Sequence, residues 1–194
     1  MRHVLLALSL LTAPAVAQAP AATPDIHAGT YSVDTNHTQV LFTVNHLGIS
    51  IYTGQFTQPT GTLTIDPAHP DTDKVEISFP IDKVSTTVPA LDTHLKSPDF
   101  FDAAKFPEGR FVSTRVTAKG MTATIAGNLT LRGVTRPVVL DARFVGSGVD
   151  RGGKTNIGFA ATTTVKRSDF GISYAVPAVS DEVKLTINAA FRAQ

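Results

Sequence analysis

Three histidines, His37, His46 and His94, are the side chains of this sequence best suited to chemistry. A neutral imidazole can ligate a metal ion, and it can transfer a proton near neutral pH. His37 and His46 are nine positions apart in a segment that reads as one strand, so an uninterrupted strand would point them to opposite faces. We therefore predict no metal site and no cofactor. Each histidine is then either structural or, for His46 and His94, a contact for the head group of a ligand.

A second candidate group consists of Asp92, His94 and Arg167, which we expect to meet in a hydrogen-bonded cluster. In a structural reading, the cluster is a buried network that pins a helical segment to the sheet. In a functional reading, these residues and His46 form the polar end of a cavity that binds a phosphate, carboxylate or amide head. Arginine suits that role because its guanidinium is a planar fork of donors. The residue types alone leave both readings open.

Catalytic motifs are weak. The chain has no cysteine, which excludes a thiol nucleophile. The run Gly171-Ile172-Ser173-Tyr174-Ala175 falls one residue short of the nucleophile-elbow pattern. We predict that the protein is not an enzyme. The alternative is a lipid- or quinone-modifying enzyme in which His46, His94 and Asp92 act as acid and base groups.

The N-terminus has the features of a secretory signal. Arg2 precedes an apolar run over residues 4–11, and small residues follow at 15–17. We predict a signal peptide at 1–17, a flexible leader at 18–28 and one domain at 29–194, and we expect the protein to be periplasmic. The apolar run is well short of the ~20 residues that a membrane-spanning helix needs, and no later run comes closer.

The charge balance argues against nucleic acid as a partner. The chain has 17 Lys and Arg against 16 Asp and Glu, and removal of the signal takes away Arg2 and no acidic residue. The mature chain is therefore neutral, and its basic residues are scattered, whereas binding to nucleic acid needs a clustered excess of Lys and Arg.

The rest of the sequence is a series of alternating strands. Apolar residues recur at every second position over 40–46, 75–81, 123–131, 138–144, 157–165 and 183–191, and less regular segments bring the total to eight or nine strands. Most joints are short and carry turn residues, which suits antiparallel hairpins. We predict an all-β fold, an antiparallel sheet of about eight strands that either folds over itself as a sandwich or closes into a barrel. A barrel of this size can hold one small ligand.

The apolar face of these strands should enclose a tunnel. Small residues such as Ala123, Gly127, Ala142 and Ala161 are interleaved with large ones and would leave room, although a filled core would also accommodate them. The predicted lining consists of Phe42, Val44, Phe56, Ile77, Phe79, Leu95, Phe100, Phe101, Ile125, Leu129, Leu140, Phe144, Phe159 and Leu185.

One segment, near residues 90–105, reads as a short helical insertion. Ser97 is a suitable N-cap, Pro98 suits the first helical position, and Pro107 ends the segment after about two turns. Phe100, Phe101 and Phe106 should then be buried. They either cap the core or close one end of the cavity, and we expect Phe100 and Phe101 to close over a bound chain.

Four motifs occur in order behind the signal, and together they resemble the YceI-like family of polyisoprenoid-binding periplasmic proteins. The motifs are Tyr31-x-x-Asp34-x-x-His37-Thr38-x-Val40-x-Phe42-x-Val44-x-His46, His94-Leu95-x-Ser97-x-Asp99-Phe100-Phe101, Gly127-x-Leu129-Thr130-Leu131-x-Gly133-Val134-Thr135 and Arg167-x-Asp169-Phe170-Gly171. The resemblance covers nearly the whole mature chain. It implies an extended lipocalin-like barrel that holds one long-chain lipid, an isoprenoid or a fatty-acid-like molecule, in a protein that is often a homodimer.

The sequence therefore predicts a periplasmic carrier that sequesters a long-chain apolar ligand such as a polyisoprenoid, an isoprenoid quinone or a fatty-acid-like lipid. Besides the enzyme, the competing reading is a stress-response interaction module whose barrel is a filled core.

Overall fold

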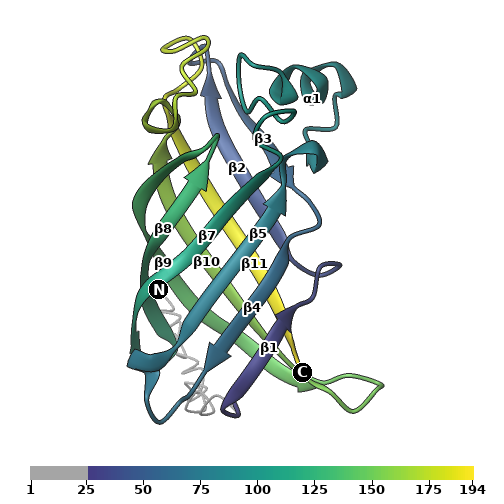
Figure 1. Cartoon of the computed structure of the whole chain (residues 1–194), viewed down its shortest axis with the longest axis vertical. Coiled ribbons are helices and arrows are strands. Elements are labelled where there is room, and N and C mark those ends of the chain that lie inside the picture. The colour runs from purple at the N-terminus through teal and green to yellow at the C-terminus, as the bar shows by residue number, and fades with distance from the viewer. Residues whose placement is uncertain (1–25) are drawn as a thin grey trace, which may run out of the picture.

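The computed structural model describes residues 26–194, and these form a tall barrel of antiparallel strands with one α-helix at its upper end (Figure 1). The predicted signal peptide, 1–17, and most of the predicted leader, 18–28, lie outside the described residues. None of the described helices is long and apolar enough to cross a membrane. The strands are β1 (Gly29–Val33), β2 (Gln39–His46), β3 (Ser50–Phe56), β4 (Thr60–Ile65), β5 (Lys74–Pro80), β6 (Val84–Ser85), β7 (Glu108–Lys119), β8 (Thr122–Leu131), β9 (Val134–Val149), β10 (Thr155–Lys166) and β11 (Glu182–Ala193).

Eight strands close the barrel. They follow the order β1-β4-β5-β7-β8-β9-β10-β11, and β1 pairs with β11 to complete the circle. All of these pairs are antiparallel. The alternation left a sandwich and a barrel open, and the resemblance implied the barrel; the closed antiparallel barrel of about eight strands is thus confirmed.

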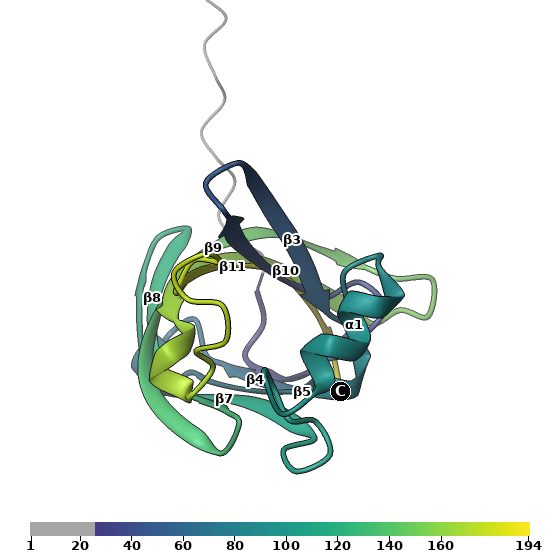
Figure 2. The ribbon, with the colours of Figure 1, turned by 90° about the horizontal axis from the view of Figure 1, so that it is seen from above.

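The other three strands extend the upper part of the wall. β2 pairs with β11, β3 with β2, and β6 with β3. Each continues the line of a barrel strand beyond a short irregular segment, here called a break: β2 follows β1, β6 follows β5, and β3 leads into β4. The breaks meet side by side, because the Thr35 hydroxyl donates to the Pro59 carbonyl at 2.9 Å and the Thr57 hydroxyl donates to the Lys83 carbonyl at 2.9 Å. The wall therefore changes direction along one line, and the β2–β3 hairpin leans away from the barrel axis (Figure 2).

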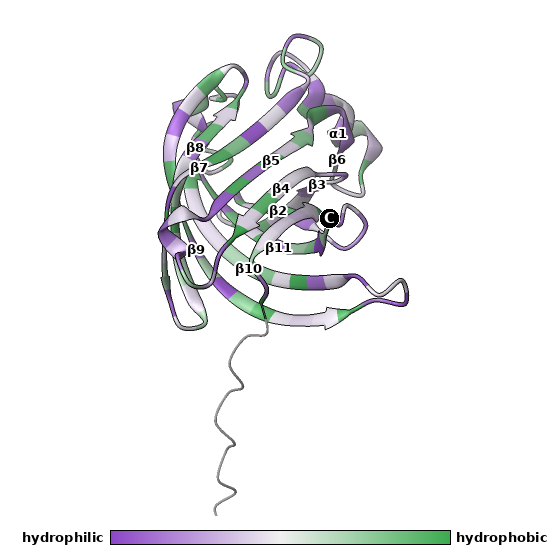
Figure 3. Cartoon of the chain, turned by 60° about the horizontal axis from the view of Figure 1, so that its bottom comes forward, coloured by the Kyte–Doolittle hydropathy of each residue, from purple (hydrophilic) through white to green (hydrophobic). Residues whose placement is uncertain are grey.

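Two β-bulges keep the large apolar residues on the inner face. The β7–β8 register shifts between Ser113 and Arg115, so Phe111 and Val116 both face inward although they are five positions apart. The β9–β10 register shifts between Gly158 and Phe159, next to Phe144 on the partner strand. Hydropathy alternates along most strands, as the colours of Figure 3 show. The irregular spacing of the apolar residues near 111–116 in the sequence is thus explained by a β-bulge.

The short helix lies earlier than the sequence signals suggested. Helix α1 spans Pro89–Lys96, and Ser97, which we expected to begin a helix, is its C-cap. The Ser97 hydroxyl makes no hydrogen bond within the described residues. Successive turns occupy the segment after it, as in the bond from the Phe106 amide to the Asp102 carbonyl at 2.9 Å. The prediction of a helix starting at Ser97 was wrong because a residue before proline is extended, and such a residue can end a helix as well as begin one.

Three glycines on the inner face sit under phenyl rings. A Cβ atom added at Gly54 would overlap the ring of Phe42, its cross-strand partner in β2. Gly109 lies in the same way under Phe79. The third case is Gly127, where the ring of Phe111 fills the space. The rings therefore lie flat against the wall instead of projecting into the interior.

We predict that Gly54→Ala lowers the free energy of unfolding by about 1–3 kcal/mol, because the Phe42 ring must leave its place on the wall. Urea unfolding followed by circular dichroism measures the change. Gly148→Ala is the matched control, since its Cβ would meet nothing within 4 Å. Adding Phe42→Leu to Gly54→Ala should recover part of the loss; equal stability of wild type and Gly54→Ala would contradict the packing argument.

Candidate ligand-binding cavity

The barrel interior holds a cavity of about 980 Å³. Its lining extends from the β4–β5 connection, at Pro67 and Pro70, to the β10–β11 loop at the other end, at Ile172 and Tyr174. Every apolar side chain predicted to line a tunnel borders this space. These residues are Phe42, Val44, Phe56, Ile77, Phe79, Leu95, Phe100, Phe101, Ile125, Leu129, Leu140, Phe144, Phe159 and Leu185.

Small residues on three neighbouring strands leave free volume inside the barrel. Ala123 of β8 is paired with Ala142 of β9, and Ala142 is paired with Ala161 of β10, so three alanines form a row across neighbouring strands. All three border the cavity. Gly127, which we also expected to leave room, does not, because the Phe111 ring occupies its place.

We call the end of the barrel beside α1 the mouth of the cavity. There His94 of α1, Phe100 and Tyr174 form an aromatic group, here called the mouth cluster. The ring of His94 lies 5.0 Å from that of Phe100 and 5.2 Å from that of Tyr174, and the last two are 5.3 Å apart. The cluster therefore links the α1 segment to the β10–β11 loop across the mouth.

Phe101, the residue after Phe100, is not part of the mouth cluster. Phe101 packs edge-on against Phe56 at 5.4 Å, and Phe56 in turn contacts Phe42 and Phe79. Phe101 is thus part of the wall. Phe106 does not border the cavity, and its ring packs against Gly133 of the β8–β9 turn.

The outside of the mouth is apolar as well. Aliphatic and aromatic side chains with exposed fractions of 37–80% come from the β2–β3 turn, the start of α1 and the β10–β11 loop. They are Leu47, Ile49, Ile51, Val88, Tyr174 and Val176.

Arg167 organises the loop over the mouth. Its side chain donates four hydrogen bonds, at 2.7–3.2 Å, and all four go to backbone carbonyls of the β10–β11 loop. The acceptors are Ile172, Tyr174, Val179 and Ser180. Arg167 is 7% exposed, and burial lowers the pKa of its guanidinium, an effect that the charge of Asp181 opposes. Arg167 remains charged at neutral pH, because an arginine is not deprotonated in proteins.

Asp181 supports this arrangement from the other side of the loop. Its carboxylate accepts hydrogen bonds from the Ser168 amide at 2.9 Å and the Ser168 hydroxyl at 2.7 Å. The bond from the Ser168 side chain is the main cause of a lowered pKa for Asp181. The two ends of the loop are thereby fastened to each other.

Asp92 does not join His94 and Arg167, so the predicted hydrogen-bonded cluster is wrong. The Asp92 carboxylate accepts from the amide and the hydroxyl of Thr86, both at 2.6 Å, and it does not border the cavity. It therefore pins α1 to the segment after β6. The three residues separate because each finds strong partners close by, and a sequence gives no sign of backbone partners.

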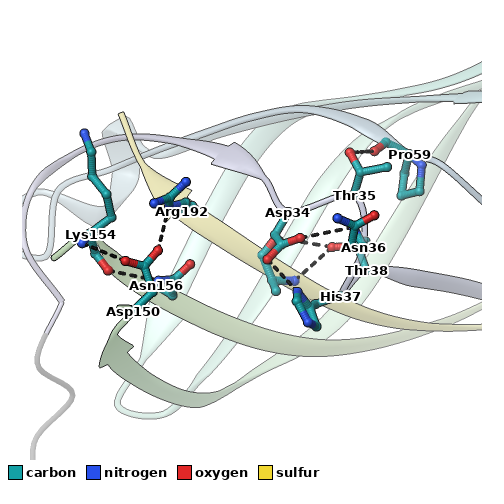
Figure 4. A network of polar contacts seen from close by, with 11 residues as sticks. Asp34, Thr35, Asn36, His37, Thr38, Pro59, Asp150, Lys154, Asn156 and Arg192 are labelled. Atoms are coloured by element: carbon teal, nitrogen blue, oxygen red, sulfur yellow. Dashed lines mark hydrogen bonds and ion pairs between the residues drawn. The ribbon is translucent and has the colours of Figure 1, made fainter. Parts of the chain in front are cut away.

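The histidines occupy two distant regions. His46 and His94 border the cavity at the mouth, and His94 Nε2 lies 3.2 Å from a carboxylate oxygen of Asp99. His37 is not on β2 but in the turn before it, where its Nδ1 contacts Asp34 at 2.7 Å (Figure 4). Within residues 26–194 no group of three metal-ligating side chains comes together.

A sequence model of the YceI-like domain matches residues 31–191. The chain belongs to the YceI-like family. A UPF0312 protein of Pseudomonas fluorescens is 39% identical over 186 residues, which are 92% of this chain and 94% of that protein. The YCEI protein of Campylobacter jejuni is 31% identical, with a TM-score of 0.69 over 77% of this chain and 90% of the other.

Two more distant structures share the YceI-like barrel. BcnA of Burkholderia cenocepacia has a TM-score of 0.74 at 20% identity and covers 81% of this chain and 98% of its own. A domain of Saccharophagus degradans, described as polyisoprenoid binding and implicated in plant cell wall breakdown, has a TM-score of 0.63 at 14% identity over 84% and 98%. At these identities the likeness extends to the fold alone.

Several residues at the mouth of the cavity were not predicted from the sequence. Tyr174 lies in the run that resembled an imperfect nucleophile elbow, and its only signal was an aromatic residue shortly after the Arg167 motif. Tyr52 and Thr86 also border the cavity, and the Tyr52 hydroxyl donates to the Thr86 carbonyl at 3.1 Å. Tyr52 follows the alternation of β3, so a closer reading of that strand could have found it.

We predict that Arg167→Lys destabilises the protein by about 1–3 kcal/mol, because an ammonium cannot reach all four carbonyls and leaves buried acceptors unpaired. Chemical unfolding measures the loss, and hydrogen exchange should show faster exchange in 172–180. Arg136→Lys is the control, since Arg136 is exposed and bonds only to its neighbour Thr135. Unchanged exchange in the loop would contradict the role given to Arg167.

Proposed function

We propose that this protein is a periplasmic carrier that holds one long-chain apolar ligand, an isoprenoid or a fatty-acid-like lipid, inside its barrel. The observation that carries the proposal is the cavity of about 980 Å³, whose lining is predominantly aliphatic and aromatic. Its volume is at the upper end of the range typical of ligand sites. The fold likeness to a domain described as polyisoprenoid binding supports the choice of ligand. The signal-like sequence at 1–17 supports the location.

Burial of the chain would supply the affinity. Each methylene moved from water into an apolar site contributes about 0.8 kcal/mol, so a dozen give about 10 kcal/mol before the cost of ordering a flexible ligand. The apolar rim at the mouth fits entry of such a ligand at this end. Binding therefore needs no covalent chemistry and no metal.

The direct test is native mass spectrometry of the mature protein secreted into a bacterial periplasm and purified without detergent or solvent. We expect a bound species whose extra mass is that of a lipid. Solvent-stripped, refolded protein should then take up a polyprenol or a long-chain alcohol. A protein that carries no lipid and takes up neither probe would refute the carrier function.

We predict that Ala142→Phe reduces the amount of co-purified lipid several-fold, because a phenyl ring would fill the space that the alanine row leaves in the cavity. Ala160→Phe is the matched control: Ala160 is the next residue to Ala161 on β10, points to the other face and does not border the cavity. Native mass spectrometry gives the occupancy, and circular dichroism checks the fold. Equal occupancy in the two variants would mean that the ligand lies elsewhere.

We predict that Phe100→Ala speeds release of the bound chain several-fold, because it opens the mouth cluster between α1 and the β10–β11 loop. Transfer of a fluorescent lipid to acceptor vesicles measures the rate. Phe106→Ala removes a ring from the same segment without touching the cavity, and it should release at the wild-type rate. If Phe100→Ala also releases at that rate, Phe100 is only a structural plug.

A further inference from the structure

We infer that the cavity selects an amphiphile with an uncharged polar head, such as an alcohol or a carbonyl group, over one with an ionised carboxylate or phosphate. The inference rests on the carrier function proposed above and narrows its ligand class. It follows from the charged groups around the cavity and from the partners that they already have.

Arg167 is the one buried cation among the described residues that border the cavity, and its donors are in use. Four of its five N–H groups are bonded to loop carbonyls. Turning the fork toward a ligand would leave those carbonyls unpaired in a buried place, which costs free energy for each group. The charge of Asp181 already faces the guanidinium. Arg167 therefore stabilises the β10–β11 loop and has its donors engaged there, so it is not a receptor for an anion.

The remaining ionisable groups at the mouth do not favour an anion either. His94 is next to the carboxylate of Asp99, so the nearest permanent charge to it is negative. His46 is exposed at the rim, where water screens any charge. Among residues 26–194 no lysine borders the cavity.

The opposite end is acidic. Asp73 borders the cavity, is 9% exposed and accepts the Asp66 amide at 2.7 Å. Burial raises the pKa of Asp73, and the charges of Asp66 and Asp71 raise it further. Arg143 also borders this end, but it is exposed to water. An anionic head placed here would lie beside the buried carboxyl group of Asp73, and the cation at this end is exposed to water.

A neutral head has no such difficulty. Enclosing an ionised group without a partner costs far more free energy than enclosing a hydroxyl or carbonyl, which needs only one hydrogen bond. Tyr52 and Thr163 border the cavity and bring hydroxyl groups to its surface. The Tyr52 oxygen, which donates to Thr86, keeps its capacity to accept.

The test compares matched probes on the stripped, full-length mature protein at about pH 8, where a carboxylic acid is ionised. One pair is a polyprenol and its monophosphate of the same length; the other is a long-chain alcohol and the carboxylate of equal length. Displacement of a fluorescent lipid gives each Kd. We expect the neutral member of each pair to bind at least about tenfold more tightly.

A variant tests the same point by adding the missing cation. Thr163→Lys places an ammonium on the inner face and should shift the preference toward the anionic member of each pair. Thr162→Lys is the control, because Thr162 is exposed and points outward. Circular dichroism checks that both variants fold.

The outcomes are distinct. Equal or tighter binding of the anions by the wild type would overturn the inference while leaving the carrier function intact, since a head that stays in water at the mouth would give equal affinities. Failure of all four probes to bind would instead overturn the carrier function itself. Should Thr163→Lys fail to fold, the wild-type comparison decides alone.

Discussion

The backbone pairing of β11 is the constraint on which the rest of the structure depends. One edge of β11 pairs with β10 along its whole length, and the other edge pairs first with β2 and then with β1. The circle therefore closes with no free edge in its lower part, and β2, β3 and β6 continue its wall above the line of breaks. Because the wall satisfies its own hydrogen bonds, the interior does not have to be filled to hold the strands together. That independence lets a stable barrel keep a cavity.

The charged residues at the mouth hold the loop and the helix at the end of the barrel in place. Arg167 and Asp181 fasten the β10–β11 loop, and Asp92 fastens α1 through Thr86. Each of these charged groups is satisfied by backbone groups or by a nearby hydroxyl. The ends of the barrel are thus shaped by charged side chains, while the surface that a ligand would meet is predominantly apolar. Shape and hydrophobic area, more than ion pairing, would then decide what binds.

The sequence predicted the fold and the lining well because both depend on the period of two, which the residues carry openly. Prediction from the sequence failed where one local sequence signal is compatible with two different structures. The pair Ser97-Pro98 fits the start of a helix and also its end, and Val88-Pro89 carries the same extended-residue-before-proline signal at the true start. The partners of Arg167 could not be predicted, because they are backbone carbonyls that any sequence possesses. His37 was assigned to a strand, but its bond with Asp34 stabilises a turn instead.

Whether an eight-stranded barrel is filled or hollow depends on the sizes of its inward residues, since the interior is only just wide enough for side chains. This chain uses eleven phenylalanines, several of them inside, and would close its own cavity if their rings pointed to the axis. Opposite or beside three of these rings stands a glycine, so the rings lie along the wall and add apolar surface without taking up the centre. The alanine row across β8, β9 and β10 leaves further space beside them. The cavity is therefore a consequence of how large and small residues are paired across strands, and it could be closed or widened by changing the small partner alone.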